Sequence, residues 1–160
     1  MWLSSTAQQA VHAVLCIAQA GEHSPVRVDE LASIIGCPRN YLSKTLHILA
    51  RARVLTSGRG RHGGFSLAGA PEKLTVARVI APFERAGQRR CLIGRPTCSD
   101  ANPCAAHNRW KKVASGVDDY FRNTTIAALM HGNTRATADT RAAILSFRNA
   151  TRRSLNGSAA

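Results

Sequence analysis

Apolar residues recur at helical spacing through the first third of the chain and predict three helices. The first begins at Ser4 or Ser5, either of which can cap it, and runs to about Ala20. A short second helix covers residues 29–35, and a third covers residues 39–53 with Leu42, Leu46 and Leu49 on its inner side. The turn Gly36-Cys37-Pro38 separates the last two, which is the pattern of a helix-turn-helix. A solvated amphipathic helix is the plainer alternative for the third.

Two short β segments follow, at residues 54–56 and 65–67. Between them, four glycines flank Arg59, Arg61 and His62, which predicts a flexible, basic hairpin tip. No Gly-Lys-Ser/Thr follows, so this is not a phosphate-binding loop. A helix-turn-helix followed by a basic hairpin is a winged helix, and a further helix over residues 74–83 is expected to close its core. We therefore expect a DNA-binding domain at residues 1–86.

The second half of the chain carries one longer apolar repeat. Steps of three and four residues predict a helix from about Cys104 to Met130, with an apolar seam of Trp110, Val113, Val117, Tyr120, Thr124 and Ala127. A small domain has too little hydrophobic core to bury the apolar side of so long a helix along its whole length. We therefore predict a dimerisation helix at residues 104–130 and a symmetric homodimer. Packing of the seam on the chain's own first helix is the alternative, and both can hold.

Charge strengthens the DNA-binding interpretation. The net charge is +13, and such a field favours nucleic acid or an acidic membrane surface. Between Arg39 and Arg61 there are six Lys or Arg and no acid, on the two elements that would touch DNA. We predict that the major groove is read by Arg39, Asn40, Ser43, Lys44 and His47. We predict that the backbone or minor groove is contacted by Arg59, Arg61 and His62.

No apolar run approaches the roughly 18 residues that span a bilayer, so no membrane partner is expected. Gln8, Gln9 and His12 interrupt the N-terminal apolar pattern, and we predict no signal peptide. The expected location is the cytoplasm, where thiols stay reduced.

The nine acids are scattered without catalytic spacing, so no enzyme is predicted. Residues 131–160 form a basic tail that we expect to be flexible, with a short helix at residues 142–147.

Three cysteines and a histidine fall within residues 91–107, spaced C-x6-C-x5-C-x2-H. Clustered thiols in a cytosolic protein indicate metal or redox chemistry. Structural zinc sites favour two close ligand pairs, whereas the long first gaps here suit a larger cluster. Iron–sulfur, zinc and free thiols all remain open at this point. Cys16, beside the first apolar stripe, is expected to be a small core residue.

Several pieces together resemble the Rrf-type winged-helix regulators, which include the iron–sulfur regulator IscR and the nitric-oxide-responsive regulator NsrR. The resemblance covers roughly residues 1–130. It rests on the Met-x-Leu start, Asn40-Tyr41-Leu42 at the third helix, RGRHGGF at residues 59–65, the three cysteines, and FRNTTIAAL at residues 121–129. It implies a dimeric transcription factor, usually a repressor, whose iron–sulfur cluster sets its affinity for DNA. Because a dimer places two recognition helices on one duplex, we expect the operator to be an imperfect palindrome. The resemblance also adds Tyr41 to the DNA-contacting positions.

The resemblance assigns Cys91, Cys98, Cys104 and His107 as ligands of an iron–sulfur cluster. Two departures stand out: the first gap is six residues rather than five, and Gln8 stands where some relatives supply a carboxylate. Gln8 is a poor anionic ligand, which favours His107, and the histidine favours [2Fe–2S] over [4Fe–4S].

The expected function is a repressor whose cluster senses iron, redox state or nitric oxide. The cluster-binding loop is predicted at residues 87–107. Its part from Cys91 to Cys104 has little local reason to hold one shape, given its Gly and Pro content, so binding a cluster would order it and connect the two parts of the chain. The alternatives are a winged-helix regulator that acts by thiol oxidation or zinc binding, and, less favoured, a redox enzyme.

Overall fold

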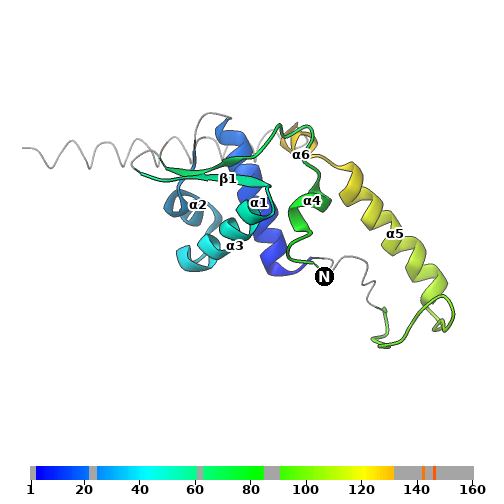
Figure 1. Ribbon diagram of the computed structural model, residues 1–160. Helices are drawn as coiled ribbons and strands as arrows, with labels where there is room; N and C mark the ends of the chain where they lie inside the picture. The colour runs from blue at the N-terminus through cyan, green and yellow to red at the C-terminus, as the bar shows by residue number, and fades with distance from the viewer. Residues whose placement is uncertain are drawn as a thin grey trace, which may run out of the picture.

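The computed structural model describes residues 3–21, 25–60, 63–84 and 91–131, together with Ala142 and Ser146. A winged-helix head contains most of the helices and a β-hairpin, and one long helix extends away from it (Figure 1). In chain order the elements are α1 (Ser5–Ala20), α2 (Val28–Ile35), α3 (Arg39–Arg51), β1 (Leu55–Gly58), β2 (Gly64–Leu67), α4 (Val76–Ile80), α5 (His107–Asn123) and α6 (Ile126–His131).

Helix α1 is the centre of the head, and it contacts α2, α3, α4, α6 and β2. The Ser4 hydroxyl caps it by accepting a hydrogen bond from the Ala7 N–H at 3.2 Å, as the sequence predicts. Its buried face combines Val14 and Ile17 with several alanines. Small side chains let neighbouring elements approach closely, so one helix can serve as the common packing surface.

The expected helix-turn-helix is present as α2, a turn and α3. Gly36 ends α2 in the left-handed conformation, with φ of 71°, and its N–H donates to the Ala32 carbonyl. The three predicted apolar positions of α3 are fully buried, at Leu42, Leu46 and Leu49. Burial of this stripe fixes α3 against the head and turns its polar side outward.

The wing is an antiparallel hairpin in which Leu55 pairs with Leu67 and Gly58 pairs with Gly64. Val26 adds a short third pairing, because its N–H and carbonyl both bond to Phe65 at 2.9 Å. A side chain at position 64 would meet the Val26 carbonyl oxygen at 2.7 Å, so this close approach requires glycine. The hairpin is thereby held to the segment before α2.

The predicted helix over residues 104–130 is wrong in its extent. It begins at His107, because Cys104 to Ala106 form a turn, and it ends at Asn123. Thr124 is extended: its carbonyl accepts the Val76 N–H at 2.9 Å, and Thr125 forms a β-bridge with Thr75. Two successive β-branched residues suit this extended pairing better than a helix. Helix α6 then starts afresh.

The predicted short helix and basic tail after residue 131 fall outside the described residues, apart from Ala142 and Ser146, which are helical. In the described part of the chain, no helix is both long enough and apolar enough to cross a bilayer.

Candidate metal centre and nucleic-acid interface

The three predicted cysteine ligands come together at the end of α5 that lies far from the head (Figure 1). The sulfurs of Cys91, Cys98 and Cys104 all lie within 4.8 Å of one another, and those of Cys91 and Cys104 are 3.6 Å apart. The loop has hydrogen bonds of its own. Gly94 closes a turn onto the Cys91 carbonyl, with φ of 74°, and the backbones of Ser99 and Asn102 bond to each other. The expectation that this loop lacks a local reason to hold one shape is therefore wrong.

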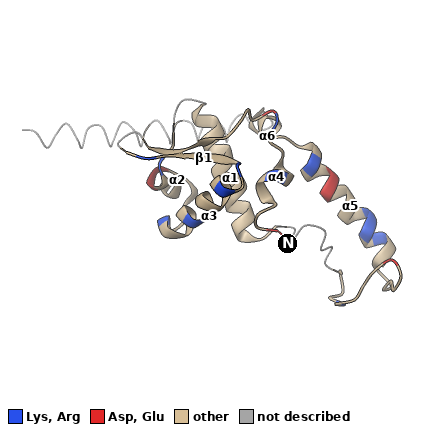
Figure 2. Cartoon of the chain, in the orientation of Figure 1, with Lys and Arg blue, Asp and Glu red and all other residues tan. Residues whose placement is uncertain are grey.

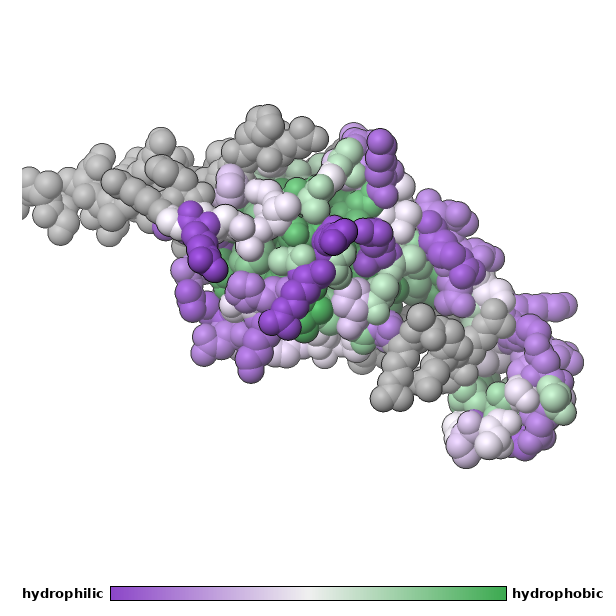
Figure 3. Space-filling model, in the orientation of Figure 1, coloured by the Kyte–Doolittle hydropathy of each residue, from purple (hydrophilic) through white to green (hydrophobic). Residues whose placement is uncertain are grey.

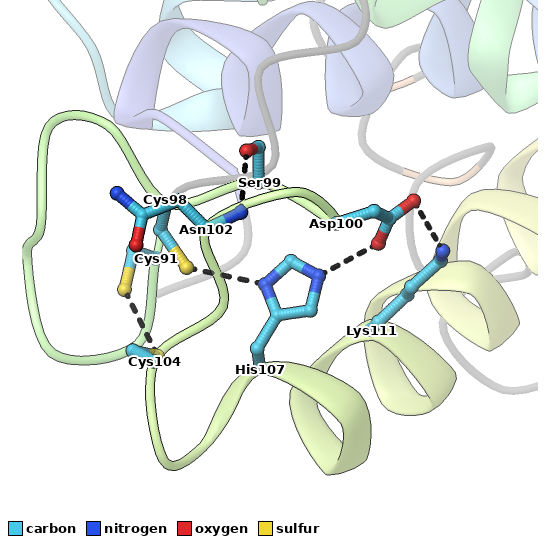
Figure 4. A network of polar contacts seen from close by, with 8 residues as sticks. All are labelled: Cys91, Cys98, Ser99, Asp100, Asn102, Cys104, His107 and Lys111. Atoms are coloured by element: carbon cyan, nitrogen blue, oxygen red, sulfur yellow. Dashed lines mark hydrogen bonds and ion pairs between the residues drawn. The ribbon is translucent and has the colours of Figure 1, made fainter.

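His107 lies at the first position of α5 and points into the cysteine group (Figure 4). Its Nδ1 is 3.1 Å from the Cys98 sulfur. Its Nε2 is 2.8 Å from Asp100 Oδ1, and the Lys111 ammonium donates to the other carboxylate oxygen at 2.6 Å. The imidazole is 15% exposed, whereas the Asp100 side chain is 70% exposed. The histidine thus connects the thiols on one side to a loop carboxylate on the other.

The thiols of the group differ in acidity. Partial burial raises the pKa of Cys91, but N–H groups of Arg95 and Ile93 and the neighbouring thiols outweigh it and lower that pKa to about 7. A backbone hydrogen bond at Cys104 lowers the pKa of Cys98, but burial and the neighbouring thiols raise it above its usual value. Lys111 and then His107 lower the pKa of Asp100 to about 2. Cys91 is therefore more readily available as a thiolate than Cys98.

These donors fit a soft or borderline metal. Sulfurs bound to one tetrahedral metal at about 2.3 Å lie about 3.8 Å from each other, close to the 3.6 Å between Cys91 and Cys104. Thiolate and imidazole donors suit zinc and iron–sulfur centres. The arrangement can therefore hold such a centre, and its donor set does not by itself choose between an ion and a cluster.

The other two cysteines lie away from this group. Cys16 is fully buried in the core, as expected, and burial raises its pKa to about 11. Cys37 lies in the helix-turn-helix turn, and burial raises its pKa as well.

The predicted DNA-contacting residues of α3 lie on its outer side. Arg39, Asn40, Tyr41, Lys44 and His47 are exposed, and Ser43 is half-buried. Figure 2 shows the cationic positions of α3 and of the hairpin on the head, well away from the cysteine loop. Arg59 is exposed immediately after β1, whereas Arg61 and His62 lie outside the described residues.

Three contacts hold this surface in ways that the sequence pattern does not indicate. Asp29 of α2 forms an ion pair with Arg39, and the Tyr41 hydroxyl bonds to Thr6 of α1. The His47 ring packs edge-on against Phe65 of the wing, with centroids 5.5 Å apart. These partners connect the outer side of α3 to α2, α1 and the wing.

The predicted dimer seam is only partly one surface. Val113 and Tyr120 are 52% and 55% exposed, while Trp110 and Val117 are half-buried. Thr124 and Ala127 lie beyond the end of α5, and Ala127 is buried in the head, where its N–H bonds to the Pro71 carbonyl. Those two residues are therefore on a different element from the other four.

Sequence reasoning did not find Asp100, Lys111 or Asp29. Asp100 and Asp29 carried no periodic signal, and a loop acid near cysteines has no fixed spacing. Lys111 had a weak signal, because it follows His107 by four residues and so shares its side of the helix.

Comparison with solved structures identifies the fold. The structure of CymR, described as the global cysteine regulator of B. subtilis, matches with a TM-score of 0.69 at 19% identity, covering 82% of this chain and 97% of that one. The T. potens IscR structure matches with a TM-score of 0.65 at 23% identity, covering 81% of this chain and 85% of that one. The predicted mainly α fold with a winged helix-turn-helix is confirmed.

Comparison with protein sequences identifies regulators. An HTH-type transcriptional regulator of Aquifex aeolicus is 38% identical over 109 residues, which are 66% of this chain and 76% of that protein. IscR of Vibrio campbellii is 27% identical over 133 residues, or 83% of this chain and 79% of that protein. These relatives are transcriptional regulators, and this chain is one too rather than an enzyme. A family model described as Rrf2, iron-dependent transcriptional regulator, matches residues 3–132, so the chain belongs to the Rrf2 family.

Proposed function

We propose that this regulator is a repressor whose operator affinity is set by an iron–sulfur cluster bound by Cys91, Cys98, Cys104 and His107. The observation that carries the proposal is the convergence of four suitable donors at one point of the structure. Three sulfurs and an imidazole nitrogen, drawn from a loop and from the start of α5, are the donors that such clusters use.

The pairing of the donors favours a [2Fe–2S] cluster, which offers two irons with two protein ligands each. Cys91 contacts Cys104, and Cys98 contacts His107. The sulfurs of Cys91 and Cys104 have the spacing of two ligands on one metal. When bound, such a cluster supplies a centre whose redox state or loss responds to iron supply, oxidants or nitric oxide. The chain contributes the loop turns and the helix end that hold the four donors together.

A second candidate is regulation by thiol oxidation, which the 3.6 Å between the sulfurs of Cys91 and Cys104 favours. The low pKa of Cys91 supplies a thiolate. In this reaction two thiols give up two electrons and two protons, hydrogen peroxide accepts them and becomes two water molecules, and an S–S bond forms. Zinc bound by the same donors is the third possibility. Iron and sulfide analysis of the anaerobically purified protein separates the three.

For DNA binding, we propose that the exposed side of α3 enters the major groove and that the wing contacts phosphates. The proposal is supported by the exposure or partial exposure of the six predicted contact residues of α3, by the exposure of Arg59, and by the absence of acids between Arg39 and Arg61. Asp29 occupies one side of the Arg39 guanidinium and leaves its remaining N–H groups for DNA.

For assembly, we propose that α5 pairs with the same helix of a second copy. Among the described elements, α5 packs mainly against α4, which leaves Val113 and Tyr120 exposed on the other part of its apolar side. A symmetric partner covers both and brings two α3 helices to one duplex. The half-sites are then about 34–36 Å apart, one helical turn, in an imperfect palindrome.

The cluster is predicted to depend on the ligand cysteines and not on the others. Cys98→Ala removes one thiolate, so the anaerobic protein should lose the visible sulfur-to-iron absorption and most of its iron. Cys37→Ala is the matched control, because this thiol lies in the helix-turn-helix turn, and it should keep both. A Cys98→Ala protein with a full chromophore would contradict the ligand assignment, and a colourless parent would contradict the cluster.

Substitutions in the proposed DNA surface are predicted to weaken operator binding in gel shifts in two different ways. Lys44→Ala should weaken operator binding by about 1–3 kcal/mol if it reads a base, and should relax discrimination at one position. Arg59→Ala should weaken all sequences alike and reduce the salt slope by about one. Lys112→Ala, an exposed cation on α5, is the control and should do neither. Unchanged affinity in both Lys44→Ala and Arg59→Ala would show that the surface is wrongly placed.

The dimer is predicted to fail when a charge is placed in its apolar seam. Val113→Asp should shift the sedimenting species from dimer to monomer at micromolar concentration, because the carboxylate would be buried without a partner. Ser115→Asp is the matched control. Ser115 follows Val113 by two positions, so its side chain lies about 200° further around the helix, on nearly the opposite side from Val113. A parent that sediments as a monomer, or a Val113→Asp dimer as stable as the parent, would overturn the proposed interface.

A further inference from the structure

The Asp100 carboxylate holds the cysteine loop against α5. One of its oxygens lies 2.8 Å from His107 Nε2, and the other accepts from the Lys111 ammonium at 2.6 Å (Figure 4). His107 and Lys111 are four residues apart on α5 and therefore share one side of the helix. Asp100 comes from the loop between Cys98 and Cys104. Both of its oxygens are thus used, and each contact joins loop to helix.

The contact at Nε2 fixes the chemistry of the imidazole. A carboxylate only accepts hydrogen bonds, so the ring nitrogen that faces it carries the proton. In a neutral imidazole the other nitrogen then has a free lone pair. That nitrogen is Nδ1, which lies 3.1 Å from the Cys98 sulfur and faces the cysteine group. The ring is only 15% exposed, so water competes little for either nitrogen.

We propose that Asp100 is a positioning residue that holds His107 as the Nε2–H tautomer, so that Nδ1 is the atom presented to the metal. Lys111 completes the arrangement by holding the second oxygen of Asp100. A hydrogen bond from the far nitrogen of a metal-bound imidazole to a carboxylate orients the ring and makes the near nitrogen a better donor. The metal part of this inference rests on the proposed function, whereas the tautomer belongs to the metal-free chain.

The first experiment measures the tautomer in the metal-free, reduced chain by long-range proton–nitrogen NMR, at a pH where the ring is neutral. Signals of His107 are assigned by their loss in His107→Gln. The parent should be Nε2–H. Asp100→Ala removes the acceptor and should give a mixture of tautomers. Asp100→Asn should invert the preference, because Lys111 takes the amide oxygen and the amide N–H₂ then donates to Nε2.

Two matched controls separate this effect from general damage to the helix. Asp119→Asn changes an acid of α5 that pairs with Arg122 rather than with His107, and it should leave the ring as Nε2–H. Lys111→Gln should loosen Asp100 and broaden the tautomer distribution, whereas the adjacent Lys112→Gln should not. A parent in the Nδ1–H form, or Asp100→Ala and Asp100→Asn proteins that remain Nε2–H, would overturn the inference.

The second experiment follows the loaded protein under anaerobic conditions. In Asp100→Ala the visible absorption should be lost to a chelator faster than in the parent, because losing an outer partner of a metal ligand typically lowers metal affinity about 10- to 100-fold. Nitrogen hyperfine spectra of the reduced protein should assign Nδ1 as ligand. Equal loss rates in the two proteins would contradict the role of Asp100. An iron-free parent would instead contradict the cluster, and the tautomer measurement would still decide whether Asp100 sets the ring.

Discussion

A short stretch of backbone pairing between residues 74–76 and 124–126 joins α5 to the head. The Val76 N–H donates to the Thr124 carbonyl at 2.9 Å, and the Ile126 N–H donates to the Leu74 carbonyl at 2.8 Å. Ile126 and Leu74 are buried in the same core as α1 and α3. The pairing stops α5 at Asn123 and fixes the direction in which it leaves the head. The position of the cysteine loop, at the other end of a helix about 25 Å long, follows from that direction.

This layout separates two chemical functions and connects them through one helix. The exposed cations of α3 and the hairpin lie on the head, and the thiols lie at the far end of α5 (Figure 2). The space-filling view shows hydrophobic surface at that far end as well, where Leu92 and Ile93 are exposed (Figure 3). Because α5 ends in backbone pairing with residues 74–76, we propose that a change in how the loop holds α5 is passed to the head through this pairing. The proposed coupling therefore needs no further element.

The sequence predicted the features that depend on short-range patterns. The stripes of α1 and α3, the Ser4 cap and the glycine-rich hairpin are all present because periodicity and turn residues act locally. The end of the long helix at Thr124 was missed because its cause is a pairing with Thr75, far away in the chain. The order of the cysteine loop was missed for a different reason. Its Gly and Pro content hid the local turns at Cys91–Gly94 and Ser99–Asn102, and no spacing rule marks an exposed loop acid such as Asp100 as the partner of a histidine and a lysine on the next helix.

The central claim is that the cluster bound by the cysteine group changes the affinity of the DNA surface for its operator. The most direct test compares operator binding by the cluster-loaded and the metal-free forms of the same protein preparation. The loaded protein and its chelated, metal-free form are titrated anaerobically against the same labelled operator at one salt concentration. A coupling of about 1–3 kcal/mol predicts dissociation constants that differ about 5- to 150-fold, with Cys98→Ala matching the metal-free form. Equal dissociation constants for the two forms on every operator tested, with the chromophore intact in the loaded protein, would contradict the account.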